Sequence, residues 1–295
     1  ATPLSLGVPT TATGGLLSKP AASSPHVLDF AFTGNLARAL FVTNNQRTDD
    51  FDLFSAPVGG GAVIQLNPTG WTTGRGVRKM KPVGTGQRVV FLADRVSGGA
   101  TTDLYGVNAD SSSLSNLVPS VTGTRTIFDF EVSPSGSKVV FLSDLQGVKD
   151  IYSVNPDGSG LVKINSSLGA GVVVDQFMIT PDSSKVLFTA QGAGGMHTLY
   201  VAPVGSGGMT VLSQVVAGRT IRQIQVSPDS SRVAYLHNST GATNFDLFAV
   251  NINGSSRTQI NQNLASGGVV KSFGFSPNSA KLFYIAETQT LGAPE

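Results

Sequence analysis

An aromatic residue recurs through the chain at nearly constant spacing, and this recurrence constrains the fold more than any other feature. Listed in order, the six positions are Phe41, Phe91, Phe141, Phe188, Tyr235 and Tyr284. Successive positions lie 50, 50, 47, 47 and 49 residues apart. Each aromatic lies in a short run that is continuously apolar, which is typical of a strand buried on both faces. A repeat of this length predicts a stack of similar units that bury each other's faces.

Turn residues divide each repeat into four short runs. The pattern is clearest at 128–165, where the apolar runs are 128–132, 138–142, 151–154 and 161–164. The turn before the aromatic run begins with Ser133-Pro134, Thr180-Pro181, Ser227-Pro228 and Ser276-Pro277 in the last four repeats. Proline fixes φ at the second turn position, and serine or threonine bonds back to nearby backbone, so a tight hairpin is expected. The sequence therefore predicts an all-β chain of four-stranded antiparallel units.

The stretch 227–251 carries a family resemblance. It contains S-P-D-S-S-R-V-A-Y-L and then D-L-F-A-V-N, a pattern that is repeated along the chain. This pattern resembles the TolB-like, WD40-like (PD40) repeat of β-propellers, although the first two repeats lack the Ser-Pro pair. The resemblance implies a single six-bladed β-propeller of four-stranded antiparallel blades. The expected blades lie near 28–66, 77–118, 127–165, 174–213, 221–261 and 269–295.

The last repeat holds only the first two expected strands. Residues 1–18 resemble the second half of a repeat, because an apolar run, a Pro/Gly turn and Gly14-Gly15 follow one another as they do at 198–213. We expect residues 1–18 to supply strands three and four of the last blade, since proteins avoid exposed sheet edges. The alternative is that residues 1–20 form a leader rich in Ser, Pro and Thr.

Composition excludes several classes of function. The net charge is +2 and only 13% of residues are charged, so no general attraction to nucleic acid is expected. The chain has no Cys, which excludes disulfides and thiolate chemistry, and no run of 18 apolar residues that would span a membrane. The N-terminal stretch lacks a basic segment before a long apolar one, so no signal peptide is expected in this chain, and earlier removal of one stays open.

The innermost strand of each blade supplies the candidate binding residues. The position eleven residues before each recurring aromatic is predicted to be core: Phe30, Met80, Phe130, Phe177, Ile224 and Phe273. Polar residues flank these positions and are expected to line a central channel: Asp29, Lys79, Lys81, Asp129, Glu131, Gln176, Gln223 and Gln225. The alternative is that the charges pair with one another and with water. Trp71, beside a basic stretch, is a further candidate for an anionic or carbohydrate partner, with a solvated loop as the alternative.

No catalytic residue, metal ligand or cofactor is predicted. The three histidines, His26, His197 and His237, occupy different positions of the repeat and do not predict a shared site. The turn 153–158 weakly resembles a calcium loop, but its twelfth position is Ile164 rather than the required Glu. A hairpin turn explains it better, and a calcium role in the loops stays open. The Asp that precedes the third run (52, 103, 150 and 246) is expected to bond backbone and fix a turn.

Two classes of function follow. The resemblance implies a non-catalytic exported binding module for a protein or glycan, located in the periplasm, outside the cell or on its surface. The partner itself is not indicated. The alternatives are a propeller-type hydrolase or polysaccharide lyase, and a repeat domain of a larger cell-surface or appendage protein. No histidine stands at the expected channel positions, which favours binding.

Overall fold

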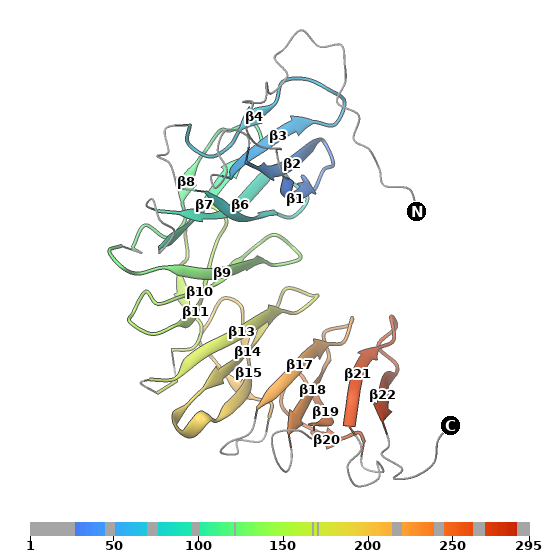
Figure 1. Cartoon of the computed structure of the whole chain (residues 1–295). Helices are drawn as coiled ribbons and strands as arrows, with labels where there is room; N and C mark the ends of the chain where they lie inside the picture. Colours follow the sequence, from blue (N-terminus) through green and yellow to red (C-terminus); the bar gives the residue numbers. More distant parts are fainter. Residues whose placement is uncertain are drawn as a thin grey trace. The chain divides into compact units, whose positions relative to one another are not determined.

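The chain folds into antiparallel sheets. The computed structural model describes residues 27–44, 51–69, 76–95, 101–120, 122–166, 168–169, 171–213, 220–238, 245–261 and 269–287 (Figure 1). These residues form six sheets, of which five have four strands and the last has two. The described part contains no α-helix, and thus no helix long and apolar enough to cross a membrane. This is the blade set of a six-bladed β-propeller, as the repeat predicts.

The chain divides into two compact units. The first comprises 1–132 with 155–159, and the second comprises 133–154 with 160–295. In the first unit, one sheet consists of β1 (Val27–Phe32), β2 (Arg38–Thr43), β3 (Asp52–Pro57) and β4 (Ile64–Gln65). The next consists of β5 (Val77–Pro82), β6 (Arg88–Asp94), β7 (Thr102–Asn108) and β8 (Ser115–Asn116). The unit also contains β9 (Ile127–Val132), which begins the third sheet.

The second unit holds the remaining strands. The rest of the third sheet is β10 (Val139–Ser143), β11 (Asp150–Val154) and β12 (Val162–Lys163). The fourth sheet is β13 (Val173–Ile179), β14 (Lys185–Gln191), β15 (His197–Pro203) and β16 (Thr210–Val211), with the 3₁₀ turn η1 (Ala193–Gly195) before β15. The fifth is β17 (Ile221–Val226), β18 (Arg232–Asn238), β19 (Phe245–Asn251) and β20 (Thr258–Gln259). The sixth is β21 (Val269–Phe275) with β22 (Leu282–Glu287).

The recurring aromatics lie on the second strand of each sheet, and in five sheets the aromatic faces another aromatic on the third strand. The stacked pairs are Phe41–Phe54, Phe91–Tyr105, Phe141–Tyr152, Phe188–Tyr200 and Tyr235–Phe248, with ring centroids 5.3 to 5.8 Å apart. Offset stacking of this kind adds stability beyond the buried area. The sixth member, Tyr284 on β22, is 40% exposed, since its sheet has no third strand among the described residues.

The predicted inner core is correct in most sheets and wrong at Phe30. Met80, Phe130 and Phe273 are buried, and Phe177 and Ile224 are partly buried against core clusters, whereas Phe30 is 65% exposed. The reason lies in which face each residue covers. Met80 shares a core cluster with Leu40 of the preceding sheet. Phe30 belongs to the first described strand, and the described part of its unit offers no earlier sheet for it to pack on.

Serines of the strand-one to strand-two turns connect successive sheets of the second unit. Ser183, Ser230 and Ser279 adopt the left-handed conformation, with φ of 64°, 62° and 59°. In each case the hydroxyl oxygen accepts a backbone N–H from the corresponding turn of the preceding repeat. The bonds are Ser135 N to Ser183 Oγ at 2.9 Å, Asp182 N to Ser230 Oγ at 3.0 Å, and Asp229 N to Ser279 Oγ at 3.0 Å. These bonds fix neighbouring sheets to one another at one end.

Some predictions fall outside the described residues. They are the completion of the sixth sheet by residues 1–18, the loop that carries Trp71, and His26. Each stays a prediction from the sequence.

Candidate functional site

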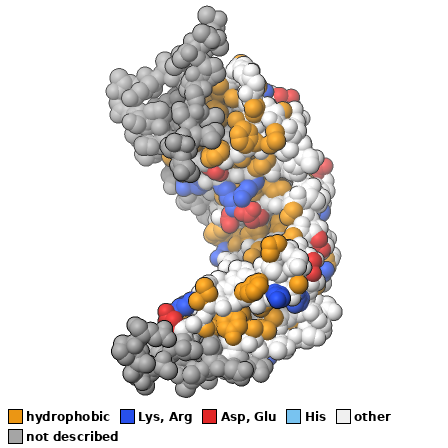
Figure 2. Space-filling view, turned by 90° about the vertical axis from the view of Figure 1, so that its right-hand side faces the viewer, with side chains coloured by type: hydrophobic (Ala, Val, Ile, Leu, Met, Phe, Trp, Pro, Cys, Tyr) orange, Lys and Arg blue, Asp and Glu red, His pale blue; other side chains and the backbone are white. Residues whose placement is uncertain are grey.

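Four charged residues of the first unit form one group, called here the charged cluster: Lys79 and Lys81 on β5, and Asp129 and Glu131 on β9. Alternation along each strand brings them to one face, since Met80 and Phe130 between them are buried. Four of the predicted channel residues therefore lie together. Figure 2 shows basic and acidic side chains gathered in one patch, with apolar side chains around it.

Lys79 is the centre of the charged cluster. Its Nζ donates to Asp129 Oδ1 and to Glu131 Oε1, both at 2.8 Å. The same ammonium lies 5.3 Å from the centroid of the Phe130 ring, within the range of a cation–π contact. The second lysine, Lys81, places Nζ 3.4 Å from Glu131 Oε2. The two strands are thus joined by a branched set of ion pairs.

The charged cluster is accessible to solvent. Its side chains are between 26% and 50% exposed. Partial burial lowers the pKa of Lys79, but its hydrogen bonds to Asp129 and Glu131 outweigh this, and the net pKa is raised. Lys79 therefore stays protonated at neutral pH. Exposed ion pairs of this kind stabilise a fold by at most about 1 kcal/mol each, so the cluster contributes little to folding.

The other predicted channel residues do not join the charged cluster. Asp29 is exposed on β1 and takes part in no ion pair among the described residues. In the second unit, Gln176 is exposed on β13, and Gln225 Nε2 on β17 donates to the carbonyl oxygen of Phe273 at 3.0 Å. Gln223, also on β17, lines a separate pocket described below.

The two described histidines lie in different settings. His197 Nδ1 on β15 is 3.2 Å from Asp175 Oδ2, and both side chains are partly exposed. His237 on β18 is fully buried and packs edge-on against the rings of Tyr235 and Phe248. Within the ranges that the structure describes, no three His, Asp or Glu side chains come together in a way suited to a metal ion.

The Asp at the beginning of the third strand is part of an Asp–Asn clasp, which joins that strand to an Asn two residues after the fourth strand. In the third sheet, Asn165 Nδ2 donates to Asp150 Oδ1 at 2.8 Å, and Asn165 Oδ1 accepts the backbone N–H of Ile151 at 3.1 Å. The same clasp is formed by Asn67 with Asp52 and by Asn261 with Asp246. The expected turn-fixing role is therefore replaced by a bond between strands.

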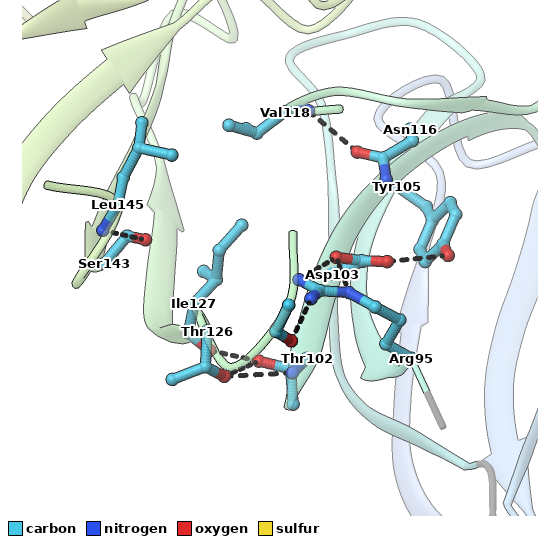
Figure 3. A network of polar contacts seen from close by, with 11 residues as sticks. Arg95, Thr102, Asp103, Tyr105, Asn116, Val118, Thr126, Ile127, Ser143 and Leu145 are labelled. Carbon is cyan, nitrogen blue, oxygen red and sulfur yellow. Dashed lines mark hydrogen bonds and ion pairs between the residues drawn. The ribbon is translucent and has the colours of Figure 1, made fainter. Parts of the chain in front are cut away.

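The second sheet departs from the clasp. Asp103 has no Asn fifteen residues later and binds Arg95 instead, with Oδ1 at 2.8 Å from Nε and 2.7 Å from Nη2 (Figure 3). The hydroxyl of Tyr105 donates to the other oxygen of Asp103 at 3.3 Å. Sequence reasoning singled out the aspartates but missed the asparagines. A constant spacing of fifteen residues was the signal for them.

The turn that weakly resembles a calcium loop uses its carboxylate internally. Asp157 Oδ1 accepts the backbone N–H of Ser159 at 2.9 Å and its hydroxyl at 2.7 Å. These bonds lower the pKa of Asp157. In the fifth sheet the neutral amide of Asn253 accepts the same two bonds from Ser255, at 3.0 and 2.7 Å. The turn thus forms with or without a negative charge.

A pocket of about 500 Å³ lies in the second unit, at the beginning of β17 and β21. Its lining residues are Arg222, Gln223, Leu236, Phe245, Val269, Val270 and Lys271. Apolar side chains form most of the wall, and two cations and an amide supply the polar groups. The volume suits a small organic ligand.

Comparison with known proteins identifies the fold. The sequence matches no family model, and no curated protein matches it. Among solved structures, the propeller-containing matches include prolyl endopeptidase, at TM-score 0.58 and 14% identity, covering 85% of this chain and 38% of that one. With the six sheets described above, this likeness supports a β-propeller fold.

Two further structures are similar to this chain. A puromycin-hydrolyzing peptidase from Mycobacterium tuberculosis matches at TM-score 0.55 and 13% identity, over 88% of this chain and 45% of the peptidase. TolB from Acinetobacter baumannii matches at TM-score 0.44 and 14% identity, over 80% of this chain and 55% of TolB. The chain thus spans about half, or less, of the length of these proteins. At such identities the likeness concerns the fold alone.

Proposed function

We propose that this chain is a non-catalytic binding module that recognises a protein or glycan partner through the innermost strands of its blades. One observation carries the proposal: the charged cluster combines two cations and two anions on β5 and β9, and all four remain partly exposed. Such side chains are held in place by one another and still reach solvent. They are therefore ready to exchange bonds with a polar partner.

The charged cluster is suited to orienting a partner more than to holding it tightly. Charged groups at an interface contribute chiefly to specificity and to the rate of encounter. Loops carried on a rigid scaffold add contact area, and Trp71 is the aromatic that the sequence offers for this purpose. The low charge and the TolB-like repeat support a periplasmic, extracellular or cell-surface location for this module.

A second candidate is a propeller that serves a hydrolase. The observation that favours it is the likeness in fold to a prolyl endopeptidase and to a puromycin-hydrolyzing peptidase, of which this chain covers less than half. In that case the chain would be the propeller portion of a longer enzyme. The catalytic groups would lie elsewhere in that enzyme.

Binding is tested with Lys79→Ala and the matched control Lys281→Ala, an exposed lysine at the turn before β22. Purified wild-type protein is first screened against an array of neutral and acidic oligosaccharides. In a second screen it is used to capture envelope proteins of the source organism, and each captured protein is identified and then purified on its own. The best ligand is titrated by calorimetry. We expect Lys79→Ala to weaken binding about tenfold at an unchanged melting temperature, and Lys281→Ala to bind like wild type.

Two outcomes would overturn the proposal. One is the absence of any saturable ligand. The other is catalytic turnover of nitrophenyl esters, peptide anilides or oligogalacturonate by the purified chain, with loss of turnover on replacement of His197 or His237.

A further inference from the structure

The pocket of the second unit combines an apolar floor with positive charge. Leu236, Phe245 and Val270 are buried and form the floor. Arg222 is exposed, and its guanidinium carbon lies 4.6 Å from the centroid of the Phe245 ring. This cation–π contact holds the guanidinium beside the ring, and its N–H groups stay available for a ligand.

Among the described residues that line the pocket, one cation has no acidic partner. Lys271 Nζ is 2.9 Å from Glu287 Oε2, so these two charges balance. Arg222 is within ion-pair distance of no acidic side chain in the described ranges of the chain. A single guanidinium over apolar surface matches a singly charged carboxylate, which it can bind through two parallel N–H···O bonds.

One residue of the pocket has a strained backbone conformation. It lies at a β-bulge, and the corresponding bulges of four other sheets show no such strain. The innermost strand of five sheets carries a β-bulge, and in four of them the extra residue lies thirteen positions before the recurring aromatic: Leu28, Arg78, Asp175 and Lys271. In the fifth sheet the extra residue is Gln223, one position later, with φ of 47°. A left-handed conformation is unfavourable for glutamine, and such residues cluster at binding sites.

Displacement of the bulge has a consequence for the pocket. A bulge redirects the side chain of its extra residue. In the fifth sheet the extra residue is Gln223, and both it and the preceding Arg222 line the pocket, so neighbouring residues of β17 supply an amide and a guanidinium. The side-chain amide of Gln223 can both donate and accept a hydrogen bond. It can therefore bond a neutral polar group of the ligand that adjoins the carboxylate.

From these observations we infer that the pocket binds a carboxylate joined to an apolar body, of the kind found at the C-terminus of a peptide that ends in an aliphatic residue. Arg222 binds the carboxylate, Gln223 bonds the adjoining amide, and Leu236, Phe245 and Val270 surround the apolar side chain. This pocket shares no residue with the charged cluster. The inference about the pocket can therefore be tested independently of the proposed function.

The test uses small probes and the complete chain. N-acetyl-leucine supplies the carboxylate, the amide and the aliphatic body, and N-acetyl-leucine amide lacks only the charge. Binding is measured by titration of backbone NMR signals at low salt. We expect N-acetyl-leucine to bind saturably and its amide to bind at least tenfold more weakly. Arg222→Gln removes the charge and is expected to weaken N-acetyl-leucine binding at least tenfold.

Arg257→Gln is the matched control, because Arg257 also lies over a ring of the fifth sheet, 5.0 Å from the centroid of Phe248, and does not line the pocket. It is expected to bind the probe like wild type. The inference is overturned if acid and amide bind equally, if neither saturates, or if folded Arg222→Gln binds like wild type. Comparison with 4-methylpentanoate identifies the source: weaker binding than N-acetyl-leucine indicates a peptide terminus, and equal binding indicates a free organic acid.

Discussion

The aspartates of the Ser/Thr-Pro-Asp turns have lowered pKa values, because they accept several hydrogen bonds. Ser227 Oγ donates to Asp229 Oδ1 at 2.6 Å, and the backbone N–H and hydroxyl of Ser231 donate to the same oxygen at 3.0 and 2.8 Å. These bonds lower the pKa of Asp229 from 3.8 to about 2. Burial raises the pKa of Asp182, but equivalent hydrogen bonds from Thr180 and Ser184 outweigh the effect of burial and lower this pKa to about 2.

The pKa of Asp229 predicts a pH dependence of stability. Because the folded-state pKa lies below the ordinary value, the carboxylate stabilises the fold above pH 3.8, and this contribution is lost as pH falls through about 2. Asp229→Asn should fold normally, since Asn278 already accepts the same Ser hydroxyl bond, at 2.8 Å, in the last turn. Its melting temperature should fall less steeply than that of wild type when pH is lowered from 4 toward 2.

The reverse substitution, Asn278→Asp, is the control for this pH dependence. It adds a carboxylate among the same donors and should make acid unfolding steeper. Parallel melting curves for Asp229→Asn, Asn278→Asp and wild type across this pH range would contradict the assignment.

At the scale of single residues, the sequence predicted which side chains are polar and face away from the core. Lys79 and Asp129 occupy equivalent positions of successive repeats, 50 residues apart. The period of two along a strand was enough to place both on one face. The bonds of Lys79 to two acids, and the bulge at Gln223, depend on side-chain reach and backbone dihedrals, which a pattern of residue types does not contain.

Among the strands, the Asp–Asn clasp is the repeated element that holds the short fourth strand. β12 has two residues, too few to hold an edge by ladder bonds alone. In the third sheet the clasp is buried: Asp150 is 2% exposed, and Lys163 of β12 adds an ion pair at 2.7 Å. Asn165 thus compensates a buried carboxylate and a buried backbone N–H together.

Asn165→Ala should destabilise the protein by roughly 2–4 kcal/mol, because each buried group left without its partner costs about 1–3 kcal/mol. Chemical denaturation measures the change. Asn155→Ala is the control, since its amide donates only to Ser159 in an exposed turn, and it should cost about 1 kcal/mol or less. Equal losses of unfolding free energy in the two variants would show that the clasp stabilises the fold no more than an exposed turn does.

The sequence predicted the order of the strands and the position of their turns, because proline, glycine and the aromatic period mark them directly. It was less accurate for the fourth strand, expected at 161–164 and observed as Val162–Lys163. The difference has a physical cause. Ile164 is buried and still donates its backbone N–H to Ile151 O at 2.9 Å, and Asn165 bonds to the third strand through its side chain, with an aspartate fifteen residues away as partner.

For the whole molecule, the sixth sheet shows where the described fold is incomplete. β21 and β22 are its only described strands. On β22, Phe283, Tyr284 and Ile285 are exposed, whereas Phe91, Phe141, Phe188 and Tyr235, the counterparts of Tyr284 in other sheets, are buried. In every other sheet, an aromatic residue of the third strand stacks on the residue at this position. We propose that residues 1–18 supply strands three and four here.

Thermal unfolding and light scattering of the chain that lacks residues 1–18 test most directly whether this protein is a six-bladed propeller completed by its own N-terminal segment. We predict a melting temperature lower by roughly 5 °C or more, self-association through the open edge of β22, and recovery of both properties when a synthetic peptide of residues 1–18 is added. A shortened chain that melts like the complete one, stays monomeric and ignores the peptide would contradict this.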